Sequence, residues 1–209
     1  MLPYRWAKFN CPAIAILLGE CYNRNRPGSP GESHFLCAAA PEDRKRGIFM
    51  MIRTAQPADL PLLVQLERAG FPPAEAATPT QLEERLATYP DHFWLLFDGD
   101  RLVSLVDGMV TDEPHLTDAM YADASLHTEQ GSWQMIFGVV TDPGYRRQGC
   151  AGQLLRRVIE DARAQGRCGV VLTCKDRLVH YYAGFGFVNE GVSASEHGGV
   201  QWFEMRLTF

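Results

Sequence analysis

The sequence lacks the marks of several protein classes. None of its apolar runs approaches the roughly 20 residues that a membrane-spanning helix needs. Its six cysteines include no CxxC pair, and Cys168 and Cys174 are too far apart for the common zinc spacing. No GxxxxGK(S/T) or GxGxxG nucleotide loop is present. These absences predict a cytoplasmic protein with reduced thiols, no metal and no membrane partner.

A large excess of charge is also missing. The net charge of −5 gives no reason to expect a nucleic-acid partner, and 46% hydrophobic residues are typical of a soluble globular protein. The first fifty residues hold seven Lys or Arg and four Asp or Glu, a net of +3 that leaves −8 for the remainder. We therefore expect an irregular N-terminal extension over residues 1–49 and a compact domain over 50–209. A signal peptide at residues 11–19 is disfavoured because no convincing cleavage site follows it.

What the domain does contain is the alternating pattern of an α/β fold. Strand and helix patterns follow in the order β-α-α-β-β-β-α-β-α-β-β, which predicts a mixed sheet covered by helices. A capping box of Thr80 and Glu83 is expected to open the helix in residues 78–90. The helix in residues 56–70 is expected to bury Leu60, Leu62, Leu63, Leu66 and Ala69.

The second half of the domain carries the clearest pattern. A polar loop over 111–131 precedes an apolar strand, 133–143, with Gly138 at its centre. A long helix ending at Gly166, a buried strand over 168–174, a short helix within 177–187 and a terminal strand over 200–209 follow.

The long helix begins without a capping side chain. The stretch "GYRRQGCAGQLL" offers free backbone N–H groups, two arginines and small residues where Ser, Thr, Asp or Asn usually stands. An anion such as a diphosphate suits this helix N-terminus. Composition alone leaves equal weight for a basic surface turn that opens an ordinary helix.

The spacing Arg146-x-x-Gly149-x-Ala151, between a strand and a helix, resembles the acetyl-CoA signature of the GNAT superfamily of N-acetyltransferases. "CKDRLVHYYAGFGFVNEG", "HGGVQWFEM" and "FPPAEAAT" resemble the bacterial relatives of arylalkylamine (serotonin) N-acetyltransferase. The resemblance runs from about Met51 to the C-terminus. It implies an α/β GNAT fold, with a mixed central sheet, helices on both faces and a splayed strand pair that admits acetyl-CoA. The implied reaction is acetyl transfer to a primary amine, in this group a small aryl or alkyl amine.

The resemblance also implies site residues. The pantetheine arm of acetyl-CoA would pair with the backbone of the splayed strand, and the pyrophosphate would bind the turn before the long helix. Tyr182 falls on the family's tyrosine general acid, and the N–H near Val139 would stabilise the oxyanion. The cofactor-binding set is then Phe137, Gly138, Val139, Val140, Arg146, Arg147, Gly149, Ala151 and Gly152.

The base that deprotonates the amine departs from the family pattern. The two histidines used by the vertebrate enzymes correspond here to Met135 and Phe137. We take His197 as the candidate base. The alternatives are His115, His127, Glu75 and Glu190, and the candidate substrate pocket consists of Phe71, Pro72, Glu75, Asp107 and Trp202.

Two other functions stay open on the sequence. The missing histidines favour a CoA-binding regulatory module without catalysis, whereas the tyrosine and the turn favour the enzyme. An open acidic groove would favour a protein N-acetyltransferase over one for small amines. The acceptor amine, the choice between monomer and homodimer, and the choice of Met50 or Met51 as the native start remain undetermined.

Overall fold

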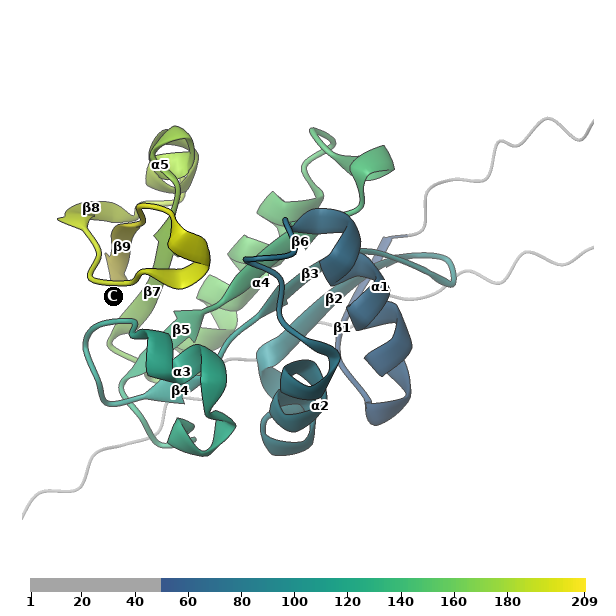
Figure 1. Cartoon of the computed structure of the whole chain (residues 1–209), viewed down its shortest axis with the longest axis horizontal. Coiled ribbons are helices and arrows are strands. Elements are labelled where there is room, and N and C mark those ends of the chain that lie inside the picture. Colours follow the sequence, from purple (N-terminus) through teal and green to yellow (C-terminus); the bar gives the residue numbers. More distant parts are fainter. Residues whose placement is uncertain (1–49) are drawn as a thin grey trace, which may run out of the picture. The chain divides into compact units, whose positions relative to one another are not determined.

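A computed structural model of the chain describes residues 50–209, and the expected N-terminal extension lies outside the described residues (Figure 1). Strands and helices alternate much as expected. In chain order they are β1 (Met50–Thr54), α1 (Leu60–Gly70), α2 (Pro79–Thr88), β2 (Phe93–Asp98), β3 (Arg101–Asp107), β4 (Val110–Thr111), α3 (Asp118–Ala122), β5 (Trp133–Ile136), β6 (Gly138–Thr141), α4 (Cys150–Ala164), β7 (Gly169–Cys174), α5 (Asp176–Ala183), β8 (Val188–Val192) and β9 (Phe203–Thr208).

The strands form two sheets that separate at one residue. One sheet has the order β1-β2-β3-β6 and is antiparallel, and the other has the order β4-β5-β7-β9-β8. In the second sheet β5 and β7 pair in parallel. The strand expected over 133–143 is divided at Phe137, so that its first half, β5, pairs with β7 and its second half, β6, pairs with β3. The expected splay therefore lies between β6 and β7, which are not paired with each other.

Helices cover both faces of the first sheet (Figure 1). Successive residues of a strand point to opposite faces. On β2, Phe93, Leu95 and Phe97 pack in one core cluster with α1 and α2, whereas Trp94 and Leu96 pack in a second cluster with α4. Because both faces are buried, β2 and β7 are apolar at nearly every position.

Two details of the expected helices are wrong. On α1 the buried residues are Leu63, Leu66 and Glu67, whereas Leu62 and Ala69 face solvent. The capping box of α2 is formed by Thr78 and Gln81 rather than by Thr80 and Glu83. Pro79 explains this start, because a residue before proline is held extended and proline suits the first helical position.

The polar segment 111–131 is more ordered than a loop. It contains α3 and a short 3-10 turn, and Met120 of α3 is buried in the core beside α1 and α2. Within residues 50–209, no helix is long and apolar enough to cross a membrane. Cys150, Cys168 and Cys174 are free thiols.

Adjacent leucines on α1 test the packing. Leu63 is 0% exposed and Leu62 is 37% exposed. We expect Leu63→Ala to lower the free energy of unfolding by about 2–5 kcal/mol, because it leaves a cavity in the core. Leu62→Ala should change it by less than about 0.5 kcal/mol. Urea denaturation of both variants measures the difference, and equal losses would contradict the described face of α1.

Candidate active site

A cleft lies where the two sheets diverge. Its walls include Asp107 of β3, the junction of β5 and β6, and the end of β7. With its opening to solvent it spans about 770 Å³. Its lining residues are Glu67, Phe71, Glu75, Ala77, Gln81, Arg85, Asp107, Tyr121, Ile136, Phe137, Gly138, Val139, Leu172, Thr173, Cys174, Leu178, Tyr182, His197 and Trp202.

Most residues singled out from the sequence near this point line the cleft. Two do not: Pro72 is exposed, and Val140 is buried in the core beside α1. The lining residues that were not singled out from the sequence include Glu67, Arg85 and Tyr121. The predicted residues that line it are Phe71, Glu75, Asp107, Phe137, Gly138, Val139, Tyr182, His197 and Trp202.

Tyr182 reaches the cleft from α5. The side chain is 6% exposed and makes edge contacts with the rings of Tyr181 and Phe187. Burial raises the pKa of Tyr182, and nearby Cys174 and Tyr181 add to the rise. The hydroxyl therefore keeps its proton at neutral pH and is available as a hydrogen-bond donor.

A buried ion pair supports the cleft floor. Arg85 of α2 donates to Asp107 Oδ2 at 3.0 Å and to the carbonyl of Tyr121 at 2.8 Å. Its guanidinium also lies 4.7 Å from the ring centroid of Phe137. Asp107 in turn requires the glycine at position 138, because a Cβ there would lie 2.6 Å from Asp107 Oδ1. One arginine thus links α2, the 111–131 segment and the point where β5 becomes β6.

Glu67 is the second carboxyl group buried beside this pair. It is 4% exposed, and its Oε1 accepts the N–H of Ala77 at 2.9 Å. Its Oε2 is buried and has no hydrogen-bond partner among the described residues. Burial and the charge of Asp107 raise the pKa of Glu67 to about 7.

Three chain segments meet around His197. Its ring stacks on Tyr121 with centroids 4.7 Å apart, and its carbonyl accepts the indole N–H of Trp202 at 2.8 Å. His197 Nε2 lies 3.1 Å from the carbonyl of Glu75. Because a carbonyl only accepts, Nε2 carries the proton of this contact. Glu75 itself is paired with Lys175 at 2.6 Å.

The turn before α4 has the open backbone expected of it. Gly149 is the N-cap residue with φ 84°, and no side chain caps the helix. Arg147 also has a positive φ of 61°, which is uncommon for a residue with a Cβ. The first intrahelical bond runs from the N–H of Gln153 to Gly149. Gly152 is buried with the ring of Phe185 beside it, so close packing also accounts for its small size.

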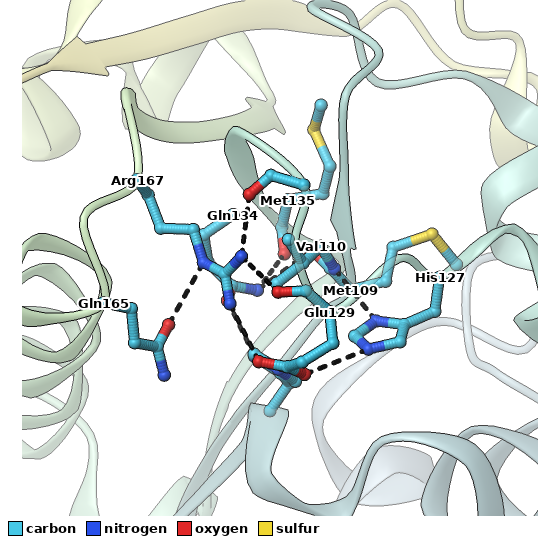
Figure 2. A network of polar contacts seen from close by, with 10 residues as sticks. Met109, Val110, His127, Glu129, Gln134, Met135, Gln165 and Arg167 are labelled. Carbon is cyan, nitrogen blue, oxygen red and sulfur yellow. Dashed lines mark hydrogen bonds and ion pairs between the residues drawn. The ribbon is translucent and has the colours of Figure 1, made fainter.

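His127 belongs to a network outside the cleft (Figure 2). Its Nδ1 accepts the N–H of Val110 at 3.2 Å, and its Nε2 lies 3.2 Å from Glu129. Burial lowers the pKa of His127, and the neighbouring His92 lowers it further. Glu129 also pairs with Arg167. The network anchors the 111–131 segment to Arg167, two residues before β7.

The remaining candidate bases also lie away from the cleft. His115 Nδ1 contacts Glu204 Oε1 at 2.6 Å, and Glu190 pairs with Arg206 at 2.8 Å. The sets His92–His127–Glu129 and His115–Glu190–Glu204 each have the residue types of a metal site. In the first set, the accepted N–H of Val110 leaves the proton of a neutral His127 on Nε2, where a metal would need a lone pair.

Comparison with known proteins defines the class of this fold and cleft, an acyltransferase. A model of the acetyltransferase (GNAT) family matches residues 60–187, more than half of the 209 residues. The chain therefore belongs to the acetyltransferase (GNAT) family, and the GNAT fold expected from the sequence is confirmed.

Two similar proteins of known name are N-acetyltransferases for different amines. The chain is 27% identical to the serotonin N-acetyltransferase of Mesocricetus auratus over 183 residues, 86% of each protein. It is 26% identical to glucosamine 6-phosphate N-acetyltransferase 1 of Oryza sativa subsp. japonica over 165 residues, 79% of this chain and 87% of that protein.

Solved structures share the fold and hold CoA compounds. The GphF GNAT-like decarboxylase in complex with isobutyryl-CoA has a TM-score of 0.66 at 22% identity, over 76% of this chain and 98% of that one. A GNAT acetyltransferase of Brucella melitensis in complex with acetyl-CoA has a TM-score of 0.52 at 18% identity, over 78% and 90%.

The buried carboxyl of Glu67 makes the stability of the protein depend on pH. Its pKa rises from 4.5 to about 7 on folding, so its contribution is full below pH 4.5 and is lost as the pH passes about 7. Relative to the parent, Glu67→Gln should therefore gain up to about 3 kcal/mol of stability between pH 4.5 and pH 8.

Urea denaturation across this pH range measures the effect. Glu83→Gln, at an exposed position of α2, is the matched control and should follow the parent. Parallel curves for parent and Glu67→Gln would contradict the raised pKa.

Proposed function

We propose that the protein is an acetyl-CoA-dependent N-acetyltransferase that acts on a small aryl or alkyl amine, in the manner of the arylalkylamine group. The observation that carries this proposal is the cleft where β6 diverges from β7 after β5, with the hydroxyl-bearing Tyr182 in its wall. Membership of the GNAT family supplies the acyl transfer. The cleft supplies the arguments for the amine and the proton donor.

Acetyl-CoA suits the two open stretches of backbone. Its diphosphate would bind the uncapped N-terminus of α4, with Gly149 allowing close approach and Arg146 and Arg147 adding positive charge. Its pantetheine arm would extend along Phe137–Val140 like an added strand. CoA compounds bound to proteins of the same fold support this assignment.

The chemistry of transfer needs a proton at the leaving sulfur. The amine nitrogen attacks the thioester carbonyl carbon, the C–S bond breaks, and the thiolate of CoA accepts a proton. Tyr182 is the donor, since its buried hydroxyl remains protonated at neutral pH. The N–H near Val139 stabilises the oxyanion of the intermediate.

The cleft favours an amine with an apolar body and without a phosphate. Its lining includes Phe71, Tyr121, Phe137 and Trp202. The cationic side chain in its lining, Arg85, is already paired with Asp107. Lys175, which is not part of the lining, is paired with Glu75, which is. A sugar phosphate, the substrate class named for one relative, would need an unpaired cation.

A screen with acetyl-CoA that reads thiol release tests the proposal. The panel contains 2-phenylethylamine, tryptamine, hexylamine, glucosamine 6-phosphate and a lysine-containing peptide. We expect turnover with the aryl or alkyl amines. Turnover with the peptide alone would favour a protein N-acetyltransferase, and CoA binding without any turnover would favour a regulatory module.

The turn before α4 can be tested separately from catalysis. We expect Gly149→Val to lower the affinity for CoA at least tenfold, because the side chain blocks the approach of the diphosphate to the backbone. Gly166→Val is the matched control, since Gly166 follows the other end of α4 with a similar φ of 76° and equally open space. Isothermal calorimetry measures both, and equal affinities would refute the assignment.

Tyr182→Phe removes one proton donor and keeps the ring. We expect kcat to fall by about 10²–10⁴-fold with little change in the affinity for acetyl-CoA. Tyr181→Phe is the control, because successive residues on a helix point about 100° apart. A Tyr182→Phe enzyme with the parent's rate at every pH would show that Tyr182 is only a packed aromatic residue.

A further inference from the structure

The proposed acetyl transfer leaves one proton without an acceptor. An alkylammonium must lose a proton before its nitrogen can attack, and its pKa, near 10 for a lysine-like amine, keeps it charged at neutral pH. Met135, at one position of the family histidines, is fully buried in the core, and Phe137 cannot accept a proton. His115, His127 and Glu190 do not line the cleft.

The two remaining candidates from the sequence are engaged. His197 directs its Nε2 proton to the carbonyl of Glu75, and its ring stacks on the ring of Tyr121. The carboxylate of Glu75 is held in an ion pair with Lys175, Oε1 to Nζ at 2.6 Å. Both groups line the cleft, but among the described residues neither has an acceptor atom that is both fully buried and without a partner.

Glu67 does have a buried acceptor atom of this kind. It lines the cleft, its Oε1 is fixed by the N–H of Ala77, and its Oε2 is a buried acceptor atom without a partner. Buried polar atoms in folded proteins almost always have a partner, so an unpaired one inside a binding cleft points to a ligand group. An ammonium N–H is such a group.

We propose that Glu67 is the general base, taking the proton from the substrate ammonium directly or through one water. This inference rests on the proposed function and adds the residue that starts the reaction. The N–H bond breaks, the proton goes to Oε2 of Glu67, and the freed lone pair attacks the thioester carbon. The C–S bond then breaks, Tyr182 protonates the sulfur, and its phenolate takes the second proton from nitrogen. Glu67 returns its proton to solvent.

The charges around Glu67 suit this role. Burial raises the pKa of both carboxyl groups, and Arg85, which bonds to Asp107 and not to Glu67, opposes this rise at Asp107. A base works best when its pKa lies near the working pH. The ionisable groups that share the cleft are Glu75, Arg85, Asp107, Tyr121, Cys174, Tyr182 and His197, with Lys175 held on Glu75.

Glu67→Gln is the informative variant, because the amide keeps the shape and can still accept the N–H of Ala77. The assay measures kcat/KM from pH 5.5 to 9 on the best amine of the screen. We expect kcat/KM to fall by about 10²–10⁴-fold at pH 7. In the parent, kcat/KM should decline below about pH 7 as Glu67 becomes protonated, and this acid limb of the pH profile should be absent from the variant. Glu83→Gln, on the exposed face of α2, should keep both the rate and the limb.

An amine that is already uncharged distinguishes a general-base role of Glu67 from a structural role. A 2,2-difluoro analogue of the same amine has a lowered ammonium pKa and is largely uncharged at pH 9, the top of the assay range, so Glu67→Gln should lose less than tenfold on it there. Equal losses on both amines, or a variant that keeps the parent's rate and acid limb, would overturn the proposal. Should Glu67→Gln fail to fold, Glu67→Asp keeps a carboxyl group and should show a reduced rate with the acid limb retained; loss of that limb would overturn it.

These outcomes differ from failure of the proposed function. If the parent protein turns over none of the amines, the proposed function is wrong and Glu67 has no reaction to start. If the parent is active and only the Glu67 variants behave otherwise than expected, acetyl transfer stands and the base is another group.

Discussion

The divergence of one continuous stretch of chain at Phe137 is the constraint on which the rest of the structure depends. β5 pairs with β7, and one residue later β6 pairs with β3 in the other sheet. Backbone groups left between the sheets need hydrogen-bond partners. We propose that the amide groups of the pantetheine arm of CoA supply such partners in this cleft.

Burying the charged side chains of the cleft costs free energy of folding, and packing alone does not explain why they are there. Glu67 and Asp107 are both buried, yet of these two carboxyl groups Arg85 is hydrogen-bonded only to that of Asp107. Burying a carboxyl without a full set of partners is unfavourable, and a stable core would avoid it. Retaining such a group in a binding cleft fits a chemical role, because the same desolvation that destabilises the fold brings a carboxyl into the range of a base at neutral pH.

The family chemistry is arranged differently in this chain. Two histidine positions of the vertebrate enzymes hold Met135 and Phe137, and these apolar residues pack in the core or on the guanidinium of Arg85. The proton acceptor that we propose lies on α1, in the lining of the cleft. His197 contacts Tyr121, Trp202 and the backbone of Glu75, and its role as a base stays a prediction from the sequence.

The sequence by itself determined the elements whose evidence is local. The sequence predicted the long helix that forms α4, the missing cap predicted an open turn at Gly149, and the apolar run at 168–174 predicted β7. Only the tertiary structure decided which charged residues are buried. Glu67 and Arg85 each fall on the apolar stripe of a helix, beside Leu63 and Leu82, and this interruption is the one trace that the sequence carries of them. Their partners Ala77 and Asp107 are distant along the chain, so burial and pairing arise from long-range contacts that a local pattern does not contain.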